Sequence, residues 1–504
     1  MIFDANTLPA DWFSERAFDV CVIGSGPAGL TLARKLAARG KRVALMEGGG
    51  TEISWESEAL YEGDSVGADY WPLTAVRKRY FGGSSNCWSG VCRQLDAHDF
   101  APVAHHSWSG WPIGKSDLDP YCAETEEILV LPADRPPAHT LFPDGTDRFT
   151  QIRLRQSNGL YLGERYAAEV EAAARLALCL HANLVDLELD DRLQRVTSGV
   201  FRSFERLEEF RVEAEVFALC LGGLENPRFL LNADRQIAGG IGNQHDLVGR
   251  FFNEHPHQHV GTVLLAAPMR NREIYAPEPR FMAEAGILNS ALLCTPDRRQ
   301  LTLPNELVRS AVCRADFLRR LTEALHGMPL VCSEGGLQAY FEQWQNPERM
   351  LTASLDIMAE QALDPTSRAR LGAERDRFGL RRIVLDWHLG ELDVHTIRTA
   401  TLAFGELLAE RDAGRLKLAD WLLEERPTFP GPDRARVCGP HHMCTTRMSD
   451  DPRRGVVDRN CRVHGMDNLY LGGSSVFATG GFANPTYTIV QLALRLADHL
   501  APTA

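Results

Sequence analysis

The chain has 504 residues, of which 44% are hydrophobic and 24% charged, a balance typical of a soluble globular protein with more than one domain. Its formal charge of −13 disfavours a nucleic-acid-binding function, because phosphate recognition needs a cationic surface, and no apolar run approaches the roughly 20 residues that span a bilayer. Residues 1–16 lack the basic start and apolar stretch of a signal peptide, and the twelve cysteines have no repeated close spacing, so we expect a cytoplasmic protein with buried free thiols and no metal site.

The first predicted elements form a nucleotide-binding unit. Residues 19–23 (DVCVI) are typical of a buried parallel strand, residues 24–29 form a G-x-G-x-x-G turn, and residues 30–38 have helical periodicity. A second strand at residues 42–46 ends at Glu47, whose carboxylate can bind ribose hydroxyls, while the glycines let the backbone approach a pyrophosphate. A glycine turn without a ligand is the alternative, but this order of elements favours a dinucleotide, either FAD or NAD. The predicted contacts are Gly24, Ser25, Gly26, Pro27, Ala28, Gly29 and Glu47.

A second glycine-containing segment follows at residues 79–93, which read RYFGGSSNCWSGVCR. The small residues 82–85 can pass close to a flat ligand and offer backbone N–H donors, and Trp88 is a flat neighbour for a ring system. An ordinary surface loop fits the same residues.

A third segment, residues 218–231, reads ALCLGGLENPRFLL. An apolar strand leads into Gly222 and Gly223, and a helix is predicted to start near Asn226, with Pro227 in its first turn. This pattern suits the edge of a nucleotide site or an ordinary β–α connection.

The stretch from about residue 256 to 430 lacks glycine fingerprints. Its strand-like runs VGTVLLA, ILNSALLC, LTASLDIMA and RRIVLDW, with a helix at residues 393–411, predict an antiparallel sheet with helices that serves as a substrate domain. The polar residues on these apparent strands fit substrate contacts or solvated positions equally well; they are Gln338, Tyr340, Glu360 and Gln361.

The C-terminal segment has the densest pattern of candidate residues. Residues 440–448 read PHHMCTTRM, residues 469–471 form a strand that stops at two glycines, and Asn484 is the predicted N-cap of a helix with Pro485 at its first position. A helix N-terminus that points inward stabilises negative charge on a ligand. His441 and Asn484 are the polar candidates for a reacting centre, against the alternatives of a structural hydrogen bond and a simple cap.

Taken together, these segments resemble the glucose–methanol–choline (GMC) oxidoreductase family over nearly the whole chain. The family's H-x-x-G-T, V-V-D, R-V-x-G-x-x-N-L-Y and N-P-x-x-T pieces are matched in order between His441 and Thr488, and GRFFNEHPH at residues 249–257 is a further match. Residues 367–387 and the loop with Trp88 are similar to the bacterial sugar-oxidising branch. The resemblance implies an α/β fold, in which an FAD-binding Rossmann-like domain with a parallel sheet is joined to a substrate domain with an antiparallel sheet.

We expect both domains to be discontinuous in sequence. The FAD-binding domain is assigned residues 1–110, 160–255 and 430–504, and the substrate-binding domain residues 111–159 and 256–429.

The resemblance also implies FAD as the cofactor, with Glu47 on the adenosine ribose, residues 82–85 along the flavin and the backbone of Val185 against the adenine. Cys444 replaces the glycine of the histidine motif, and Cys87 stands where some sugar-oxidising relatives carry a histidine joined covalently to the flavin. We therefore expect non-covalent FAD and a buried Cys87 thiol, with a cysteinyl link as the alternative. The implied cofactor contacts beyond the first turn are Gly82, Gly83, Ser84, Ser85, Asn86, Cys87, Trp88, Val185, Gly223, Gly473, Ser474, Pro485 and Thr486.

The function implied is oxidation of a CH–OH group on a sugar, glycoside or amino-sugar-like substrate. His441 would accept the hydroxyl proton, Asn484 would position the oxygen, flavin N5 would accept the hydride, and His442 would have a structural role. A hydroxynitrile-lyase-like enzyme on the same fold and a non-catalytic flavin-binding protein are the alternatives. The sequence does not distinguish oxygen from a redox partner as the electron acceptor, and it leaves a homo-oligomer open.

Overall fold

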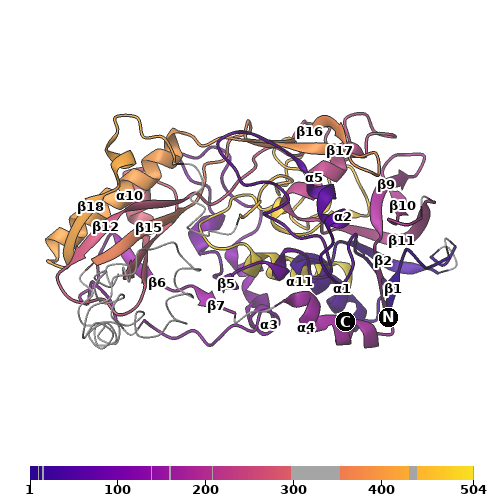
Figure 1. The fold of residues 1–504 in the computed structure, drawn as a ribbon, viewed down its shortest axis with the longest axis horizontal. Helices are drawn as coiled ribbons and strands as arrows, with labels where there is room; N and C mark the ends of the chain where they lie inside the picture. Colours follow the sequence, from indigo (N-terminus) through magenta and orange to yellow (C-terminus); the bar gives the residue numbers. More distant parts are fainter. Residues whose placement is uncertain are drawn as a thin grey trace, which may run out of the picture.

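The computed structural model describes residues 1–502 apart from residues 10, 14–15, 138, 158–160, 207, 297–351 and 431–439. The molecule is elongated, with one large sheet toward each end of its long axis (Figure 1). Both chain ends lie beside the sheet that contains β1 and β2 (Figure 1). Among the described residues, no helix has the length and apolar character needed to cross a membrane.

The sheet near the termini is mainly parallel, with the strand order β1-β8-β3-β2-β11-β10-β9 among the described residues and β19 paired to β11. The pairs from β1 through β11 and the β11–β19 pair are parallel, whereas β10 is antiparallel to both of its neighbours. The strands are β1 (Ile2–Asp4), β2 (Phe18–Ile23), β3 (Val43–Met46), β8 (Leu176–Leu180), β9 (Asn183–Leu189), β10 (Val196–Arg202), β11 (Phe210–Leu219) and β19 (Leu469–Leu471).

Both faces of this sheet are buried, as expected for parallel strands. In β2, Val20 and Val22 join the apolar cluster that includes α1 and α11, while Cys21 and Ile23 join the cluster on the opposite face. The helices of this region are α1 (Pro27–Ala38), α3 (Cys122–Ile128), α4 (Leu162–Ala172), α5 (Gly222–Asn232) and α11 (Thr486–Leu500). The predicted strand–turn–helix–strand unit is therefore present. The bounds of both strands agree with the prediction to within a residue or two, and the helix begins three residues earlier than predicted.

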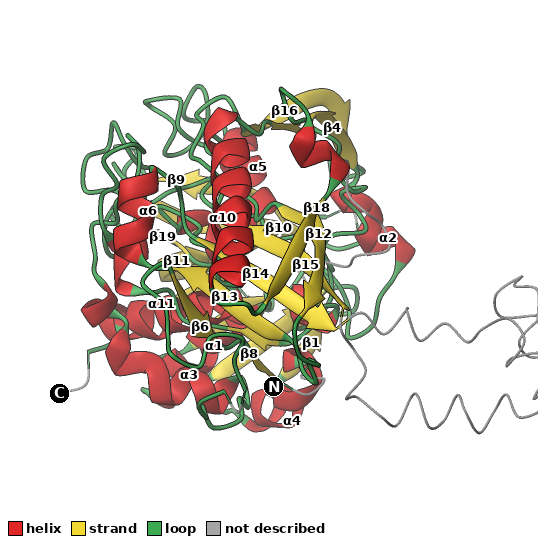
Figure 2. Ribbon diagram, turned by 90° about the vertical axis from the view of Figure 1, so that its left-hand side faces the viewer, coloured by secondary structure: helices red, strands yellow, loops and turns green. Residues whose placement is uncertain are grey.

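The second large sheet is antiparallel throughout its described strands, in the order β18-β12-β15-β14-β13-β6. Helix α10 (Glu391–Glu410) lies across this sheet (Figure 2), and its Ile397 and Phe404 pack into the apolar cluster with Leu292 and Leu355. The strands are β6 (Phe149–Ile152), β12 (His257–Leu265), β13 (Glu273–Pro277), β14 (Ser290–Pro296), β15 (Thr352–Ala359) and β18 (Gly414–Leu418), with the short helix α6 (Pro279–Ala285) beside them. The predicted α/β class, with a parallel and an antiparallel sheet, is confirmed, and the assignment of domain boundaries stays a prediction.

One predicted strand does not join the antiparallel sheet. β17 (Arg381–Trp387) pairs in parallel with β4 (Gly63–Gly67) and antiparallel with β16 (Arg368–Arg375) in a separate three-stranded sheet. The reason is its apolar face, because Ile383 and Leu385 are buried with Leu224 of α5 and Phe252. The remaining short elements are β5 (Val91–Cys92), paired with β7 (Arg155–Gln156), and α2 (Trp55–Glu58).

The start of α5 also differs from the prediction, since the helix begins at Gly222 and Pro227 lies inside it. Proline has no N–H to donate to the carbonyl four residues earlier. That carbonyl, Gly223 O, accepts a hydrogen bond from the Thr445 hydroxyl at 2.6 Å, so the C-terminal segment supplies the missing donor. Asn226 links the same turn to the loop after β19, because its amide donates to Gly472 O at 3.1 Å and to Ser475 Oγ at 2.9 Å.

Candidate active site

The predicted dinucleotide turn leaves open space at the N-terminus of α1. Gly24 has φ +98°, and a Cβ there would lie 2.6 Å from Cys220 O, while a Cβ on Gly29 would lie 1.9 Å from Gly24 O. A Cβ on Gly26 would meet nothing within 4 Å, and Gly26 caps α1 without a side-chain hydrogen bond. The first N–H groups of the helix therefore face a space that no side chain fills, which fits the pyrophosphate of a dinucleotide such as FAD.

Glu47 and Ser25 join the first and second glycine segments. The buried Glu47 carboxylate accepts hydrogen bonds from Ser25 N at 3.1 Å, from Ser25 Oγ at 2.6 Å and from Gly49 N at 2.8 Å. Ser25 Oγ also accepts from Gly82 N at 3.2 Å, and a Cβ on Gly83 would lie 2.9 Å from Gly26 Cα. The two segments predicted to share a ligand are thus in contact, whereas the bond between Glu47 and a ribose stays a prediction.

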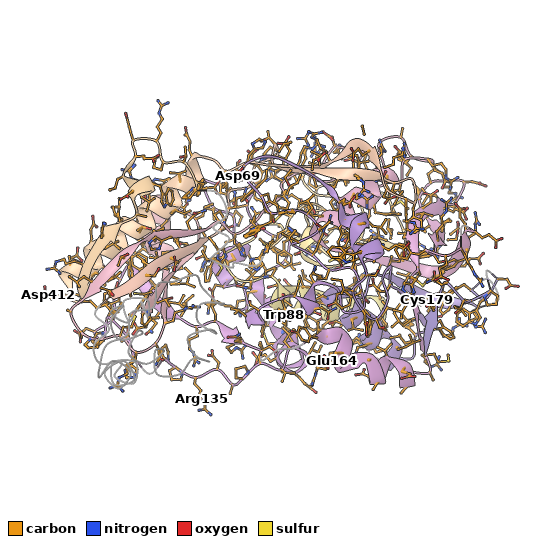
Figure 3. All side chains as sticks on the ribbon, in the orientation of Figure 1. Asp69, Trp88, Arg135, Glu164, Cys179 and Asp412 are labelled. Atoms are coloured by element: carbon orange, nitrogen blue, oxygen red, sulfur yellow. The ribbon has the colours of Figure 1, made fainter. Side chains whose placement is uncertain are left out.

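The loop after Gly82 is ordered by small polar side chains. Ser85 Oγ donates to Gly82 O at 2.6 Å and accepts from Leu162 N at the start of α4, and Asn86 Nδ2 donates to Phe81 O at 2.9 Å. Trp88 packs at the rim of the apolar cluster with α1 and lies near the middle of the long axis of the molecule (Figure 3).

Cys87 is exposed, so the expectation of a buried thiol is wrong at this position. It follows a short 3₁₀ turn at the surface, and its Sγ contacts Ser84 O at 3.4 Å. Partial desolvation raises the pKa of the Cys87 thiol, which lowers its thiolate fraction. Every cysteine among the described residues is a free thiol.

Two other predicted cofactor contacts, Val185 and Gly473, have backbone that a ligand can approach. Val185 is the extra residue where the β9–β10 register shifts, because Leu184 pairs with Phe201 and Asp186 with Val200. A residue at such a bulge is left out of the strand ladder, so its backbone groups are free for another partner. Gly473 has φ +101°, and a Cβ there would have only Gly222 Cα nearby, at 3.9 Å.

A cavity of about 1920 Å³ brings the two predicted catalytic residues together. Its lining comes from the antiparallel sheet, from the segment before β12 and from the C-terminal region, and includes Tyr70, Glu254, His255, His257, His441 and Asn484. Of the polar strand residues expected to be solvated or in contact with substrate, Glu360 and Gln361 are instead buried, and Gln338 and Tyr340 lie outside the described residues. Gln361 holds the segment before β12, since its side chain accepts from Glu254 N at 2.9 Å.

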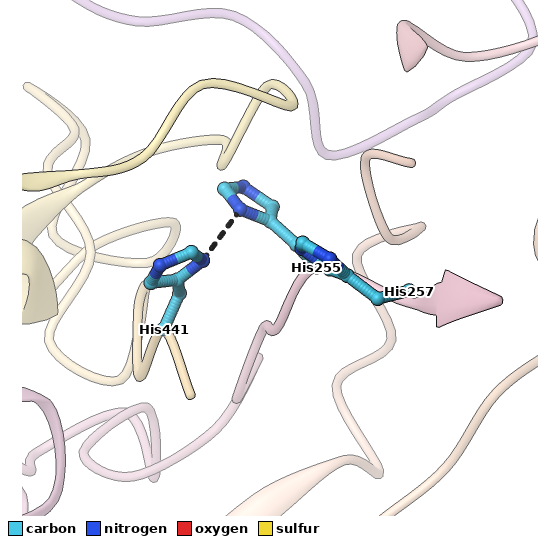
Figure 4. A group of neighbouring side chains, drawn as sticks. All are labelled: His255, His257 and His441. Carbon is cyan, nitrogen blue, oxygen red and sulfur yellow. Dashed lines mark hydrogen bonds between the residues drawn. The ribbon is translucent and has the colours of Figure 1, made fainter. Parts of the chain in front are cut away.

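His441 lies beside two other imidazoles. Its Nδ1 is 2.9 Å from His255 Nδ1, and its ring centroid is 6.2 Å from that of His257 (Figure 4). Burial holds the pKa of His441 well below its usual range, and His255, His257 and His442 lower it further. His441 is therefore neutral at physiological pH and retains a ring lone pair that can accept a proton.

Asn484 is not the cap of α11, contrary to the prediction. The N-cap is Pro485, the helix starts at Thr486, and no side chain caps it. Asn484 Oδ1 is buried without a hydrogen-bond partner, and the residue lines the same cavity as His441. A buried amide oxygen without a partner costs free energy, which a ligand hydroxyl at this position would recover.

His442 lies behind the candidate site. Its ring contacts the aromatic rings of Tyr70 and Phe252, its backbone oxygen accepts from Ser474 Oγ at 2.7 Å, and a Cβ on Gly223 would lie 2.1 Å from that oxygen. His442 is not part of the cavity lining described above, and its contacts with Gly223 and Ser474 support the structural role expected for it.

The sequence reasoning missed Glu254, Tyr70, His255 and His257 as site residues. Glu254 Oε1 accepts from the backbone N–H of His441 at 2.6 Å and of His255 at 3.0 Å, and Oε2 accepts from the Tyr70 hydroxyl at 2.6 Å. Burial raises the pKa of Glu254 to about 7, although these hydrogen bonds favour the carboxylate. Three of these residues, Glu254, His255 and His257, belong to GRFFNEHPH, which directly precedes and opens β12. In the sequence this segment was a family match and did not indicate a place in the site.

Comparisons with known proteins bear on the family and the cofactor. A family model described as GMC oxidoreductase matches residues 365–493, and one described as FAD binding domain matches residues 19–57. The chain is 24% identical to 6'''-hydroxyparomomycin C oxidase of Streptomyces lividus, over 97% of this chain and 93% of that protein. It is 24% identical to paromamine 6'-oxidase of Streptomyces fradiae, over 97% and 92%, and 22% identical to 2-methyl-1,2-propanediol dehydrogenase of Mycolicibacterium austroafricanum, over 96% and 95%.

Solved structures share the fold at low sequence identity. Pyridoxine 4-oxidase from Mesorbium loti has a TM-score of 0.55 and 18% identity, with 96% of this chain and 99% of that chain covered. A fungal aryl-alcohol oxidase has a TM-score of 0.55 and 16% identity, with coverage of 96% and 98%. These likenesses support the same two-sheet α/β architecture.

Proposed function

Because the chain belongs to the GMC oxidoreductase family and is an FAD-dependent oxidoreductase that acts on CH–OH groups, we propose that its substrate is a sugar, a glycoside or an amino-sugar-like compound. Two of the similar proteins are named as oxidases of paromomycin-type aminoglycosides, which favours this class over simple alcohols. The volume of about 1920 Å³ exceeds the roughly 300–1,000 Å³ of an ordinary ligand pocket, so it suits a substrate of several rings beside the cofactor. The net charge of −13 favours the approach of a cationic amino sugar.

The single observation that carries the proposal is that a neutral histidine and an unpaired amide oxygen line one cavity. Bound FAD supplies the hydride acceptor, and the protein must remove the hydroxyl proton. An alcohol is too weak an acid to ionise at neutral pH, so a base has to accept this proton as the hydride leaves. His441 meets the requirement because it is held without a charge.

The contact between the two imidazoles suits one tautomer of the proposed base. A hydrogen bond between His441 Nδ1 and His255 Nδ1 needs a hydrogen on one of them. With that hydrogen on His441, its Nε2 keeps the lone pair and accepts the substrate proton, while Glu254 fixes the His441 backbone. Asn484 positions the substrate, since its amide nitrogen can donate to the reacting oxygen and its free Oδ1 can accept from a neighbouring hydroxyl.

Anaerobic mixing of the holoenzyme with sugars, glycosides and amino sugars tests the proposed function. Bleaching of the flavin absorbance by a member of this panel is the expected result. Release of cyanide from hydroxynitriles without bleaching would instead indicate a lyase. Bleaching by simple diols but by no sugar, glycoside or amino sugar would contradict the substrate class.

We also propose that FAD is held without a covalent bond, in a cytoplasmic protein. Cys87 offers no imidazole nitrogen, and its thiol is mostly protonated at neutral pH. The flavin is expected to come free on acid precipitation, and a pellet that keeps its flavin would overturn this part of the proposal.

A further inference from the structure

The cavity contains a cluster of three histidines that proton transfer alone does not require. His255 and His257 come from the segment that opens β12, and His441 comes from the C-terminal region (Figure 4). One ring nitrogen of each residue lies within 4.8 Å of the others. Proton transfer uses His441 and its partner His255, but it gives no role to His257 and does not explain why three ring nitrogens lie together.

The chemistry of the cluster matches the ligand set of a transition metal. Neutral imidazole is the histidine form that coordinates a metal ion, and histidine is the most common metal ligand among protein side chains. The Nε2 atom of His257 is buried without a hydrogen-bond partner, and that of His255 is buried beside the backbone of Gly480 and Gly481. Three histidines with one side open to a cavity leave a coordination position for water or substrate.

We propose that His255, His257 and His441 bind a divalent transition-metal ion of the zinc class, and that this ion inhibits the enzyme. Three nitrogen ligands with a free fourth position suit Zn²⁺, whose preferred geometry is tetrahedral. The nearby Glu254 side chain fixes the backbone of two of the ligands. Coordination uses the one lone pair of the neutral His441 ring, so the other ring nitrogen carries the hydrogen and cannot accept the substrate proton. Metal binding and catalysis therefore compete for His441.

Metal binding stands on the cluster itself, whereas the inhibition rests on the proposed function. The two are therefore measured separately. Holoenzyme freed of metals with a chelator is titrated with Zn²⁺ by calorimetry, and the same samples are assayed for flavin reduction.

The decisive variant is His257→Gln, because His257 is a ligand in the proposal but not the proposed base. His259→Gln is the matched control: it lies two residues further along β12, outside the cluster, with its Nδ1 held 3.1 Å from Asp356 Oδ1. The wild type is expected to bind one Zn²⁺ per chain at this site. His257→Gln should weaken that binding by at least about 100-fold, more than the 10–100-fold typical of residues that only orient a ligand, and His259→Gln should leave it unchanged.

Equal Zn²⁺ affinity in the wild type and in folded His257→Gln, checked by circular dichroism, would overturn the site, as would the absence of stoichiometric binding. If His257→Gln does not fold, His441→Ala provides the same comparison. Stoichiometric binding with unchanged flavin reduction would overturn the inhibition alone. If no substrate reduces the flavin, the calorimetry still decides whether the cluster is a metal site.

Discussion

Glu254 illustrates how a single buried side chain can set the geometry of the proposed base. Its carboxylate holds the backbone of His441 and His255 and is itself held by the Tyr70 hydroxyl. Glu254→Ala is expected to slow flavin reduction by about 10- to 100-fold at saturating substrate, since a small misplacement of a catalytic group has this effect. Rapid mixing under anaerobic conditions measures the rate.

The conservative variant separates position from charge at this residue. Glu254→Gln keeps an oxygen that accepts from both N–H groups, so it should restore most of the rate lost in Glu254→Ala. If the glutamine variant is as slow as the alanine variant, the negative charge and not the position of His441 is what matters.

A second prediction at the residue scale concerns Asn484, which the sequence suggested to be the N-cap of the C-terminal helix. A residue that caps a helix would lose stability on truncation, but Asn484 does not cap α11. Asn484→Ala should therefore melt close to the wild-type temperature and slow flavin reduction by about tenfold or more, through loss of a positioning hydrogen bond. If Asn484→Ala had a clearly lower melting temperature and reduced flavin at the wild-type rate, the role of Asn484 would be structural.

At the scale of elements, the start of α5 depends on a hydroxyl from another part of the chain. Thr445→Val leaves the buried Gly223 carbonyl without its donor and is expected to lower the free energy of unfolding by about 1–3 kcal/mol. Thr446→Val is the matched control, because its buried Oγ1 has no hydrogen-bond partner, so its loss should be neutral or stabilising. Thermal melts of both variants test the pair, and equal destabilisation would contradict this account of Pro227.

The elements that follow local rules were predictable from the sequence. Strand β2, the glycine turn and β3 were found because an apolar run, a glycine turn and a helix succeed one another within 30 residues. The start of α5 was misplaced because Pro227 indicated a first turn. The Thr445 hydroxyl, which replaces the missing N–H donor, is 222 residues from its acceptor Gly223 in sequence. β17 was assigned to the wrong sheet because its periodicity gives a strand but not its neighbour, and β4 lies more than 300 residues earlier.

At the scale of the whole molecule, stability should depend on a carboxyl buried next to the proposed site. Burial, and then the Asp99 carboxylate, raise the pKa of Glu360 to about 8 from the usual 4.5. Between these two values the folded protein binds a proton that the unfolded chain does not, so the free energy of unfolding falls by about 1.4 kcal/mol per pH unit as the pH rises.

Glu360→Gln removes this titration and should raise the melting temperature relative to the wild type at pH 8 to a greater degree than at pH 5. Thermal melts across the range check the difference. A variant whose melting temperature follows the wild type in parallel would show that Glu360 does not titrate in this interval.

The residues of the site come from distant parts of the chain, so only the folded molecule brings them together. His441 and Asn484 were predicted because both belong to the C-terminal motifs, but His255 lies 186 residues before His441 and meets it only through the packing of the two large parts of the fold. No local pattern encodes such a contact. The GRFFNEHPH segment indicated a family and gave no reason to place its histidines in the cavity.

The most direct test of the central claim is the rate of flavin reduction in His441→Ala. This variant should fold and bind FAD, while reduction by substrate slows by about two to four orders of magnitude, the usual effect of losing a general base. Because the pKa of His441 lies well below 6.5, the wild-type rate should decline only at more acidic pH, where the imidazole gains a proton, and that decline should be absent from the variant. His442→Ala, behind the site, should cost little. A wild-type rate in His441→Ala, or an inactive His442→Ala beside an active His441→Ala, would contradict the assignment of the base.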